Sequence, residues 1–191
     1  PYKETVLILC LIAVFAISGT LLLASILTKK DLKMNMMNTI LGVLLIAYVI
    51  ALFKVLFLDR TNISGSHHIY SKEMRTLNLV PFETIKMFIR SWNHGYLGKG
   101  LIISNIFGNI LMFMPMVILM WCIFKTLRKP WLVVIINFVI IVAVETAQYI
   151  FAVGSCDIDD LILNMIGVII GYIIVTRKSF QKLCKKLYII E

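Results

Sequence analysis

Acidic and amide side chains gather within one otherwise apolar stretch of the chain, residues 145–171. Glu145 and Gln148 are three residues apart, so they share one face of a helix. A second polar stripe follows at offsets of four, three and four residues, which is also helical spacing: Asp160, Asn164, Gly167 and Gly171. Lipid cannot solvate these groups, so both stripes must face protein or water. A buried carboxylate among amides is suited to binding a polar ligand or, as a general base, to moving a proton.

Glu145 is the one acid that lies well inside a segment apolar enough to cross a membrane. Its carboxyl group must stay protonated there or find a cation. Lys54, near the end of another apolar segment, is the candidate partner, although a lysine there can instead extend its ammonium group to the outer headgroups. A neutral Glu145 that only links helices by hydrogen bonds is the alternative to a functional site, and we favour the site.

Three aspartates, Asp157, Asp159 and Asp160, open the last apolar segment. Carboxylates at a helix start cap free N–H groups and oppose the positive end of the helix dipole, which accounts for one or two of them. The cluster could instead bind a divalent cation, which prefers oxygen ligands, or pair with Lys86 or Arg90. A divalent cation at these three residues is therefore a hypothesis, and no other cofactor or metal is assigned.

The composition identifies an integral membrane protein. The chain has 191 residues, is 60% hydrophobic and has a mean hydropathy of +0.94, whereas a soluble domain is about 45–50% apolar. About 20 residues are needed to cross a bilayer, and five segments qualify: 5–27, 39–58, 106–124, 131–151 and 158–175. We expect an all-α, polytopic membrane helix bundle of five transmembrane helices, forming a single domain over residues 1–191. The first segment is too long for a signal peptide, so it is expected to be retained.

The distribution of basic residues predicts how the bundle is oriented. Eleven lysines and arginines fall in the loop after the first span, the loop after the third span and the C-terminal tail, whereas seven fall on the opposite side. The seven are spread over far longer loops, so the positive-inside rule puts the N-terminus outside and the C-terminus in the cytoplasm. This topology explains the net charge of +9, and nucleic-acid binding is therefore excluded.

The long outer loop, residues 59–104, is predicted to contain a helix. Within 77–92, apolar side chains recur at helical spacing, and Pro81 suits the first turn because its missing N–H costs nothing there. Glu83, Lys86 and Arg90 fall on another face. The pattern indicates an amphipathic helix at the outer interface, or a re-entrant segment against the bundle. The three histidines and four cysteines show no metal-site spacing.

The polar residues of four spans are predicted to lie at a similar depth. At a rise of about 1.5 Å per residue, Glu145 and Asn164 lie roughly 9 Å below the outer ends of their helices. Asn109 lies near the outer start of the third span, with Asn105 one turn above it, and Lys54 lies near the outer end of the second. We therefore expect an outward-facing polar pocket between these helices.

Four motifs in this order resemble the VanZ-like family: Asn78-Leu79-Val80-Pro81-Phe82, then Asn105-x3-Asn109-x3-Phe113-x-Pro115, then Glu145-x2-Gln148, then Asp157-Ile158-Asp159-Asp160-x3-Asn164-x2-Gly167-x3-Gly171. The resemblance covers roughly residues 40–176. It implies a polytopic bacterial membrane protein of the cell envelope, and the founding member is associated with resistance to teicoplanin, a glycopeptide antibiotic with a lipid tail. Many relatives carry an arginine before the aspartates, where this chain has Gly154-Ser155-Cys156.

Two functions of different classes follow from these residues and the resemblance. The first is binding, in the outward-facing pocket, of an anionic lipid-linked ligand such as a cell-wall precursor, or of the lipoglycopeptide itself, with membrane lipids as further partners. Its ligand-binding residues would be Asn78, Asn105, Asn109, Gln148, Asp157, Asp159, Asn164, Lys86, Arg90 and Lys54. The alternative is a membrane-embedded hydrolase or transferase on a lipid-linked phosphate, with Glu145 and Asp160 as its catalytic residues. A helical scaffold for a partner protein is a third class, against which the polar layer argues.

Overall fold

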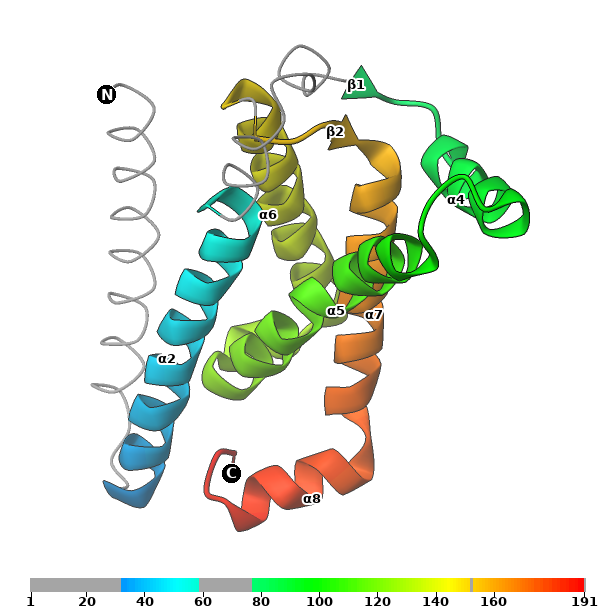
Figure 1. The fold of residues 1–191 in the computed structure, drawn as a ribbon. Helices are drawn as coiled ribbons and strands as arrows, with labels where there is room; N and C mark the ends of the chain where they lie inside the picture. The colour runs from blue at the N-terminus through cyan, green and yellow to red at the C-terminus, as the bar shows by residue number, and fades with distance from the viewer. Residues whose placement is uncertain (1–31, 59–76, 152, 191) are drawn as a thin grey trace.

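The structure, a computed structural model, describes residues 32–58, 77–151 and 153–190 of the chain (Figure 1). Within these residues it has the helices α2 (Leu32–Phe53), α4 (Glu83–His94), α5 (Lys99–Ile123), α6 (Pro130–Ile150), α7 (Ile158–Thr176) and α8 (Lys178–Lys186), the short helical turns η1 (Lys54–Leu58) and η2 (Lys125–Arg128), and the two-residue strands β1 (Leu77–Asn78) and β2 (Cys156–Asp157). The predicted all-α fold is confirmed, since the strands make up only four residues.

Four helices of the described part are long and apolar enough to cross a membrane: Met36–Leu58, Lys99–Ile123, Pro130–Ile150 and Ile158–Thr176. They correspond to the second to fifth predicted spans, and the predicted span 5–27 lies outside the described residues. The helix α5 already begins at Lys99, so the last residues of the predicted outer loop 59–104 are helical.

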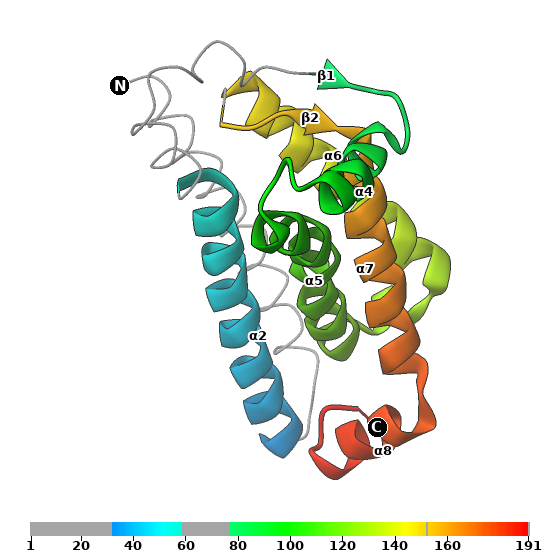
Figure 2. The same cartoon turned by 45° about the vertical axis from the view of Figure 1, so that its right-hand side comes forward.

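The predicted amphipathic helix of the outer segment is confirmed as α4, but its start was placed too early. Pro81 lies in the turn before the helix, and Phe82 adopts a left-handed conformation with φ of 66°. Helical geometry begins only at Glu83. Phe88 and Ser91 form the buried face of α4. In Figures 1 and 2, α4 extends sideways from one end of the bundle, above the start of α5.

The helices α5 and α7 are in backbone contact, and this contact forms the centre of the bundle (Figure 2). A Cβ atom on Gly167 would lie 1.9 Å from the backbone oxygen of Ile110, and one on Gly171 would lie 3.0 Å from the backbone oxygen of Met114. Small residues let membrane helices approach this closely, because lipid provides no hydrophobic drive for association. Gly167 and Gly171 therefore serve the packing of α7 against α5.

A proline within α5 lies beside the contact between α5 and α2. Pro115 has no N–H, so the carbonyl of Leu111 loses its usual partner within the helix. One residue further on, the hydroxyl of Tyr48 in α2 donates to the carbonyl of Met112. The hydrogen bond from Tyr48 thus joins α2 to α5 close to the position where Pro115 leaves a carbonyl without a partner.

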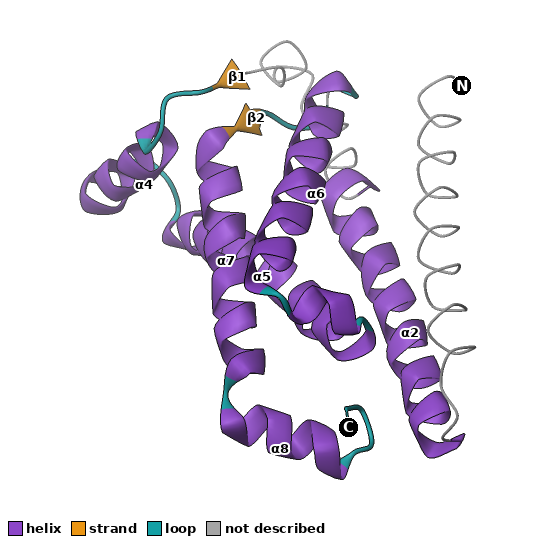
Figure 3. Ribbon diagram, turned by 180° about the vertical axis from the view of Figure 1, so that it is seen from behind, coloured by secondary structure: helices purple, strands orange, loops and turns teal. Residues whose placement is uncertain are grey.

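The helix α8, which was not predicted, lies across the end of the bundle opposite α4 (Figure 3). Its inward face carries Cys184, which is buried, and Phe180, whose ring meets Trp121 edge-on with ring centroids 6.2 Å apart. Its lysines are exposed. This division into a buried apolar side and a basic exposed side is typical of a helix lying along a membrane surface.

Candidate functional site

Two segments that are distant in the sequence meet at the α4 end of the bundle. The strands β1 and β2 pair in parallel, with Leu77 opposite Cys156 and Asn78 opposite Asp157 (Figure 1). The chain runs from β1 into α4 and from β2 into α7. The pairing therefore fixes the start of α4 against the start of α7.

Asp157 joins these two segments through its carboxylate. It caps its own helix by accepting a hydrogen bond from the N–H of Asp159, at 2.9 Å, as the sequence predicts. It also accepts from Nδ2 of Asn78, at 3.2 Å, and from the hydroxyl of Thr84, at 2.5 Å. Asn78 in turn donates to Thr84 and accepts from the N–H of Val80. We call this hydrogen-bonded group, together with Asp159, the aspartate junction.

Asp159 is fully buried in the aspartate junction and caps the other helix, α4. One carboxylate oxygen accepts from the N–H of Phe82, at 2.5 Å, and the other from the N–H of Ile85, at 3.0 Å. A negative charge at this position also opposes the positive end of the α4 dipole. The left-handed conformation of Phe82 turns its N–H toward the carboxylate, so a residue from α7 supplies the cap that α4 lacks locally.

Asp160, the third aspartate, accepts a hydrogen bond from Nδ2 of Asn109, at 2.5 Å, and so connects α7 to α5. All three carboxylates therefore receive protein donors. Among the described residues no group of three or more histidines, cysteines, aspartates or glutamates is placed to hold a metal ion. Lys86 and Arg90 lie exposed on α4.

A layer of buried polar residues on α5, α6 and α7 lies on the bundle side of the junction. Its members are at most 6% exposed: Asn109, Glu145, Gln148 and Asn164. Nε2 of Gln148 donates to the carbonyl of Leu56, at 3.1 Å, and so fixes the π-helical turn η1 to α6. We call these four residues the polar layer; they belong to three spans, whereas the sequence predicts polar residues from four.

Two acceptors of the polar layer have no hydrogen-bond donor within the described part of the chain. They are Oε1 of Gln148 and Oδ1 of Asn164. Burying an unsatisfied acceptor costs about 1–3 kcal/mol, and native proteins rarely leave such groups unmatched. These atoms are suited to receiving hydroxyl or amine donors from a bound molecule or from ordered water.

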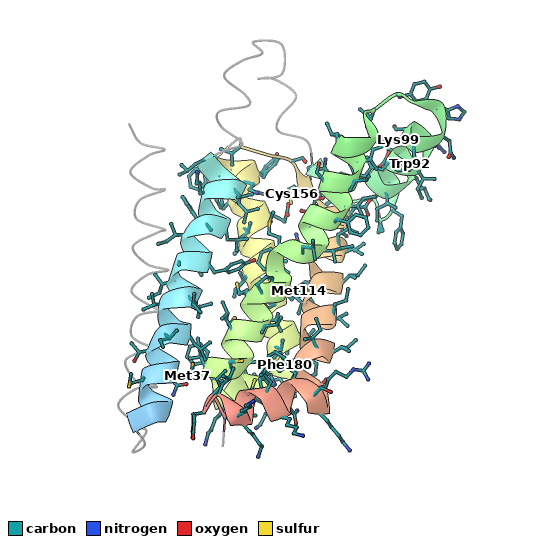
Figure 4. The ribbon with its side chains drawn as sticks, turned by 60° about the horizontal axis from the view of Figure 1, so that its bottom comes forward. Met37, Trp92, Lys99, Met114, Cys156 and Phe180 are labelled. Atoms are coloured by element: carbon teal, nitrogen blue, oxygen red, sulfur yellow. The ribbon has the colours of Figure 1, made fainter. Side chains whose placement is uncertain are left out.

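Cys156 marks the place where the aspartate junction and the polar layer adjoin, and Figure 4 shows it at the end of the bundle beside α2 and α6. The side chain is half-buried. Burial raises the pKa of its thiol, and the negative charges of Glu145 and Asp157 raise this pKa further.

Cys156 is expected to react slowly with alkylating reagents. Because its pKa is raised, the thiolate fraction at pH 7 is smaller than that of an ordinary cysteine, and the rate should increase about tenfold per pH unit up to that pKa. Glu145→Gln removes one of the charges that raise the pKa, so it should speed the reaction. The measurement is iodoacetamide alkylation between pH 7 and 10, in a chain whose other cysteines, Cys10, Cys122 and Cys184, are changed to alanine.

The control for this rate is Asn137→Ala, which alters α6 eight residues before Glu145 and leaves the charge unchanged. Equal rates for wild type and Glu145→Gln would contradict the effect of the Glu145 charge on the thiol.

The remaining predicted site residues lie apart from the polar layer. Nδ2 of Asn105 donates to the carbonyl of Leu101 in its own helix, at 2.9 Å. Lys54 is exposed on η1. Sequence reasoning missed Thr84, whose role depends on a partner 73 residues away, and the ammonium group of Lys99, which lies 5.0 Å from the centre of the Trp92 ring (Figure 4). Neither carries a local sequence signal.

Comparison with known proteins agrees with this arrangement. A family model described as VanZ/LLP1 matches residues 45–180, which include the aspartate junction and the polar layer. The chain belongs to the VanZ-like family. No curated protein and no solved structure matches it. With its apolar helices, the VanZ-like chain is a multi-pass membrane protein.

Proposed function

We propose that this VanZ-like protein binds the polar head group of an anionic lipid-linked ligand, or of a teicoplanin-type lipoglycopeptide, at the α4 end of its bundle. The observation that carries the proposal is the pair of buried acceptors on Gln148 and Asn164, which have no donor within the described residues. The carboxyl group of Glu145 is buried in the same layer. Sugar hydroxyls and amines, which both ligand classes present, are the donors that these acceptors would receive.

The surface of α4 and of the start of α5 carries basic and apolar side chains, which suit the anionic group and the lipid tail of such a ligand. Lys86, Arg90 and Lys99 are exposed and would attract its anionic group. Beside them, Met87 and Ile89 are 46% and 56% exposed. Apolar side chains on an amphipathic helix enter the boundary between headgroups and acyl chains, so a lipid tail would remain in the membrane while its head group is bound.

The excess of basic residues at the opposite end supports placing α4 on the outer side of the membrane. A cell-wall precursor on the outer leaflet, or an antibiotic arriving from outside, would then reach the polar layer without crossing the bilayer. Labelling of Cys156 on intact cells with a membrane-impermeant maleimide at high pH checks this orientation.

The double variant Glu145→Ala, Asn164→Ala is expected to bind the ligand at least about tenfold more weakly. Loss of two hydrogen bonds, one of them to a charged or acidic group, corresponds to this range. The measurement is the binding of teicoplanin and of a sugar-linked polyprenyl pyrophosphate to the purified protein in nanodiscs. Release of phosphate in the same samples would indicate an enzyme instead.

Asn137→Ala is the matched control for this experiment. Asn137 is a buried amide of the same helix, its Oδ1 also has no partner among the described residues, and its Nδ2 donates only within α6. It lies eight residues nearer the opposite end than Glu145. Unchanged binding in the double variant, or an equal loss in Asn137→Ala, would remove the support for the polar layer as the binding site.

A further inference from the structure

A second region with unmatched polar atoms lies at the opposite end of the molecule, at the turn η2. The guanidinium group of Arg128 lies over the indole ring of Trp121, with Cζ 5.0 Å from the ring centre. Its Nε and Nη2 are both buried, and neither has a hydrogen-bond partner in the part of the chain that the structure describes. A guanidinium cannot lose its proton in a protein, so burial leaves a permanent charge and its donors without compensation.

No acid of the described chain lies at this end. The two segments that form it, residues 125–130 and 177–190, contain eight lysines and arginines and no aspartate or glutamate. The described acids belong to α4, the last turns of α6 and the β2–α7 region: Glu83, Glu145, Asp157, Asp159 and Asp160. Within the described residues, therefore, no acid compensates the charge of Arg128, and Asp31 and Glu191 lie outside these residues.

The structure holds the Arg128 backbone and side chain in place through contacts with α7 and α5. The hydroxyl of Tyr172, in α7, donates to the Arg128 carbonyl at 3.0 Å. Trp121, in α5, supports the plane of the guanidinium and is itself covered at its edge by Phe180 of α8. Burial raises the pKa of Cys184 in α8, while a hydrogen bond with Cys122 and the charge of Arg128 lower it.

We propose that Arg128 is the centre of a phosphate-binding site for the head group of an anionic phospholipid on the α8 side of the membrane. A guanidinium fixed on an aromatic face presents two parallel N–H donors, which match two phosphate oxygens. Arg128 as a residue is only half-buried, although its Nε and Nη2 are buried, so part of it lies at the surface of this end of the bundle. The exposed Lys125, Lys129 and Arg177 raise the local concentration of anions. This site lies at the other end of the bundle from the proposed head-group site and is independent of it.

The test uses the full chain in a phosphate-free maltoside detergent. Trp92→Phe and Trp131→Phe leave Trp121 as the sole tryptophan, because the chain has three. Its fluorescence is followed while one of three probes is added: a short-chain phosphatidylglycerol, inorganic phosphate, or a monoacylglycerol that has no phosphate. We expect a saturable change with the phosphatidylglycerol, a weaker one with inorganic phosphate and none with the monoacylglycerol.

Three variants separate the specific site from general attraction of anions. Arg128→Gln should weaken phosphatidylglycerol binding about tenfold or more, and Arg128→Lys should also weaken it, because an ammonium group lacks the two-pronged geometry. Arg177→Gln removes the same charge from an exposed position of this end and should change binding less than about twofold.

Three results would overturn the proposal. One is the absence of a saturable change with either phosphate probe in the chain that retains Arg128, a measurement that does not depend on the folding of any Arg128 variant. Another is an equal loss of binding in Arg177→Gln and Arg128→Gln, which would indicate a diffuse basic surface. The third is inorganic phosphate binding as tightly as the lipid, which would replace the phospholipid by a free phosphate.

Discussion

Gly167→Ala is expected to destabilise the protein by about 3 kcal/mol or more, at the upper end of the range for overpacked positions. The added Cβ would lie 1.9 Å from the backbone oxygen of Ile110. Because the atom it meets belongs to a helix backbone, no side chain can rotate away, and α5 and α7 must separate. The measurement is the midpoint of thermal unfolding in detergent, followed by circular dichroism.

Substitutions of two other glycines provide a comparison for the stability loss expected in Gly167→Ala. Gly171→Ala should cost less, because its Cβ would lie 3.0 Å from the Met114 oxygen. Gly108→Ala should be neutral or stabilising, since nothing lies within 4 Å of the new atom and alanine is the better helix former. Equal effects of the three substitutions would show that backbone contact between α5 and α7 does not determine stability.

Asp159→Ala is expected to cost about 2–4 kcal/mol, from the loss of a helix cap and of the acceptor for two N–H groups. The carboxylate receives the N–H groups of Phe82 and Ile85 in a fully buried position. Without it, the start of α4 should detach from α7. We expect faster hydrogen exchange at these two amides and new proteolytic cleavage between Leu79 and Ile85, together with a lower unfolding midpoint.

Glu83→Gln is the matched control for Asp159→Ala. Glu83 is the acid of the first turn of α4 and is exposed. If electrostatic attraction to the helix dipole were the main effect, removing this charge would weaken α4 about as much. A large loss in Glu83→Gln, or normal protection of the Phe82 and Ile85 amides in Asp159→Ala, would contradict the hydrogen-bonded cap.

The membrane spans could be predicted because their signal is local. A run of apolar residues determines a span without reference to any other part of the chain, and α6 and α7 begin and end within one residue of the prediction. The start of α5 could not be predicted in this way. Lys99 and Gly100 are typical of a loop, yet they form the first turn of α5.

The site was predictable only in part, because its contacts join distant segments. Helical spacing and depth identify Glu145, Gln148 and Asn164 as polar residues within spans, and the structure buries all three. Capping by Asp157 was predicted from its position before a helix. The role of Asp159 was not, since its donors lie 74 and 77 residues earlier in the chain.

At the basic end of the molecule, too, the sequence alone does not distinguish one basic residue from another. The sequence explains its lysines and arginines as a topology signal, and that reading treats all of them alike. Only the structure distinguishes Arg128, whose donors are buried against Trp121 and α8, from Arg177, which is exposed.

The aspartate junction makes α4 and α7 one mechanical unit. Both ends of the cap are rigid: a buried carboxylate at the first turn of one helix holds backbone amides at the first turn of the other. Because α7 has 19 residues and continues almost directly into α8, a displacement of α4 is transmitted along a rod of about 28 Å. We therefore expect tilting of α4 to displace the end of α7 from which α8 begins.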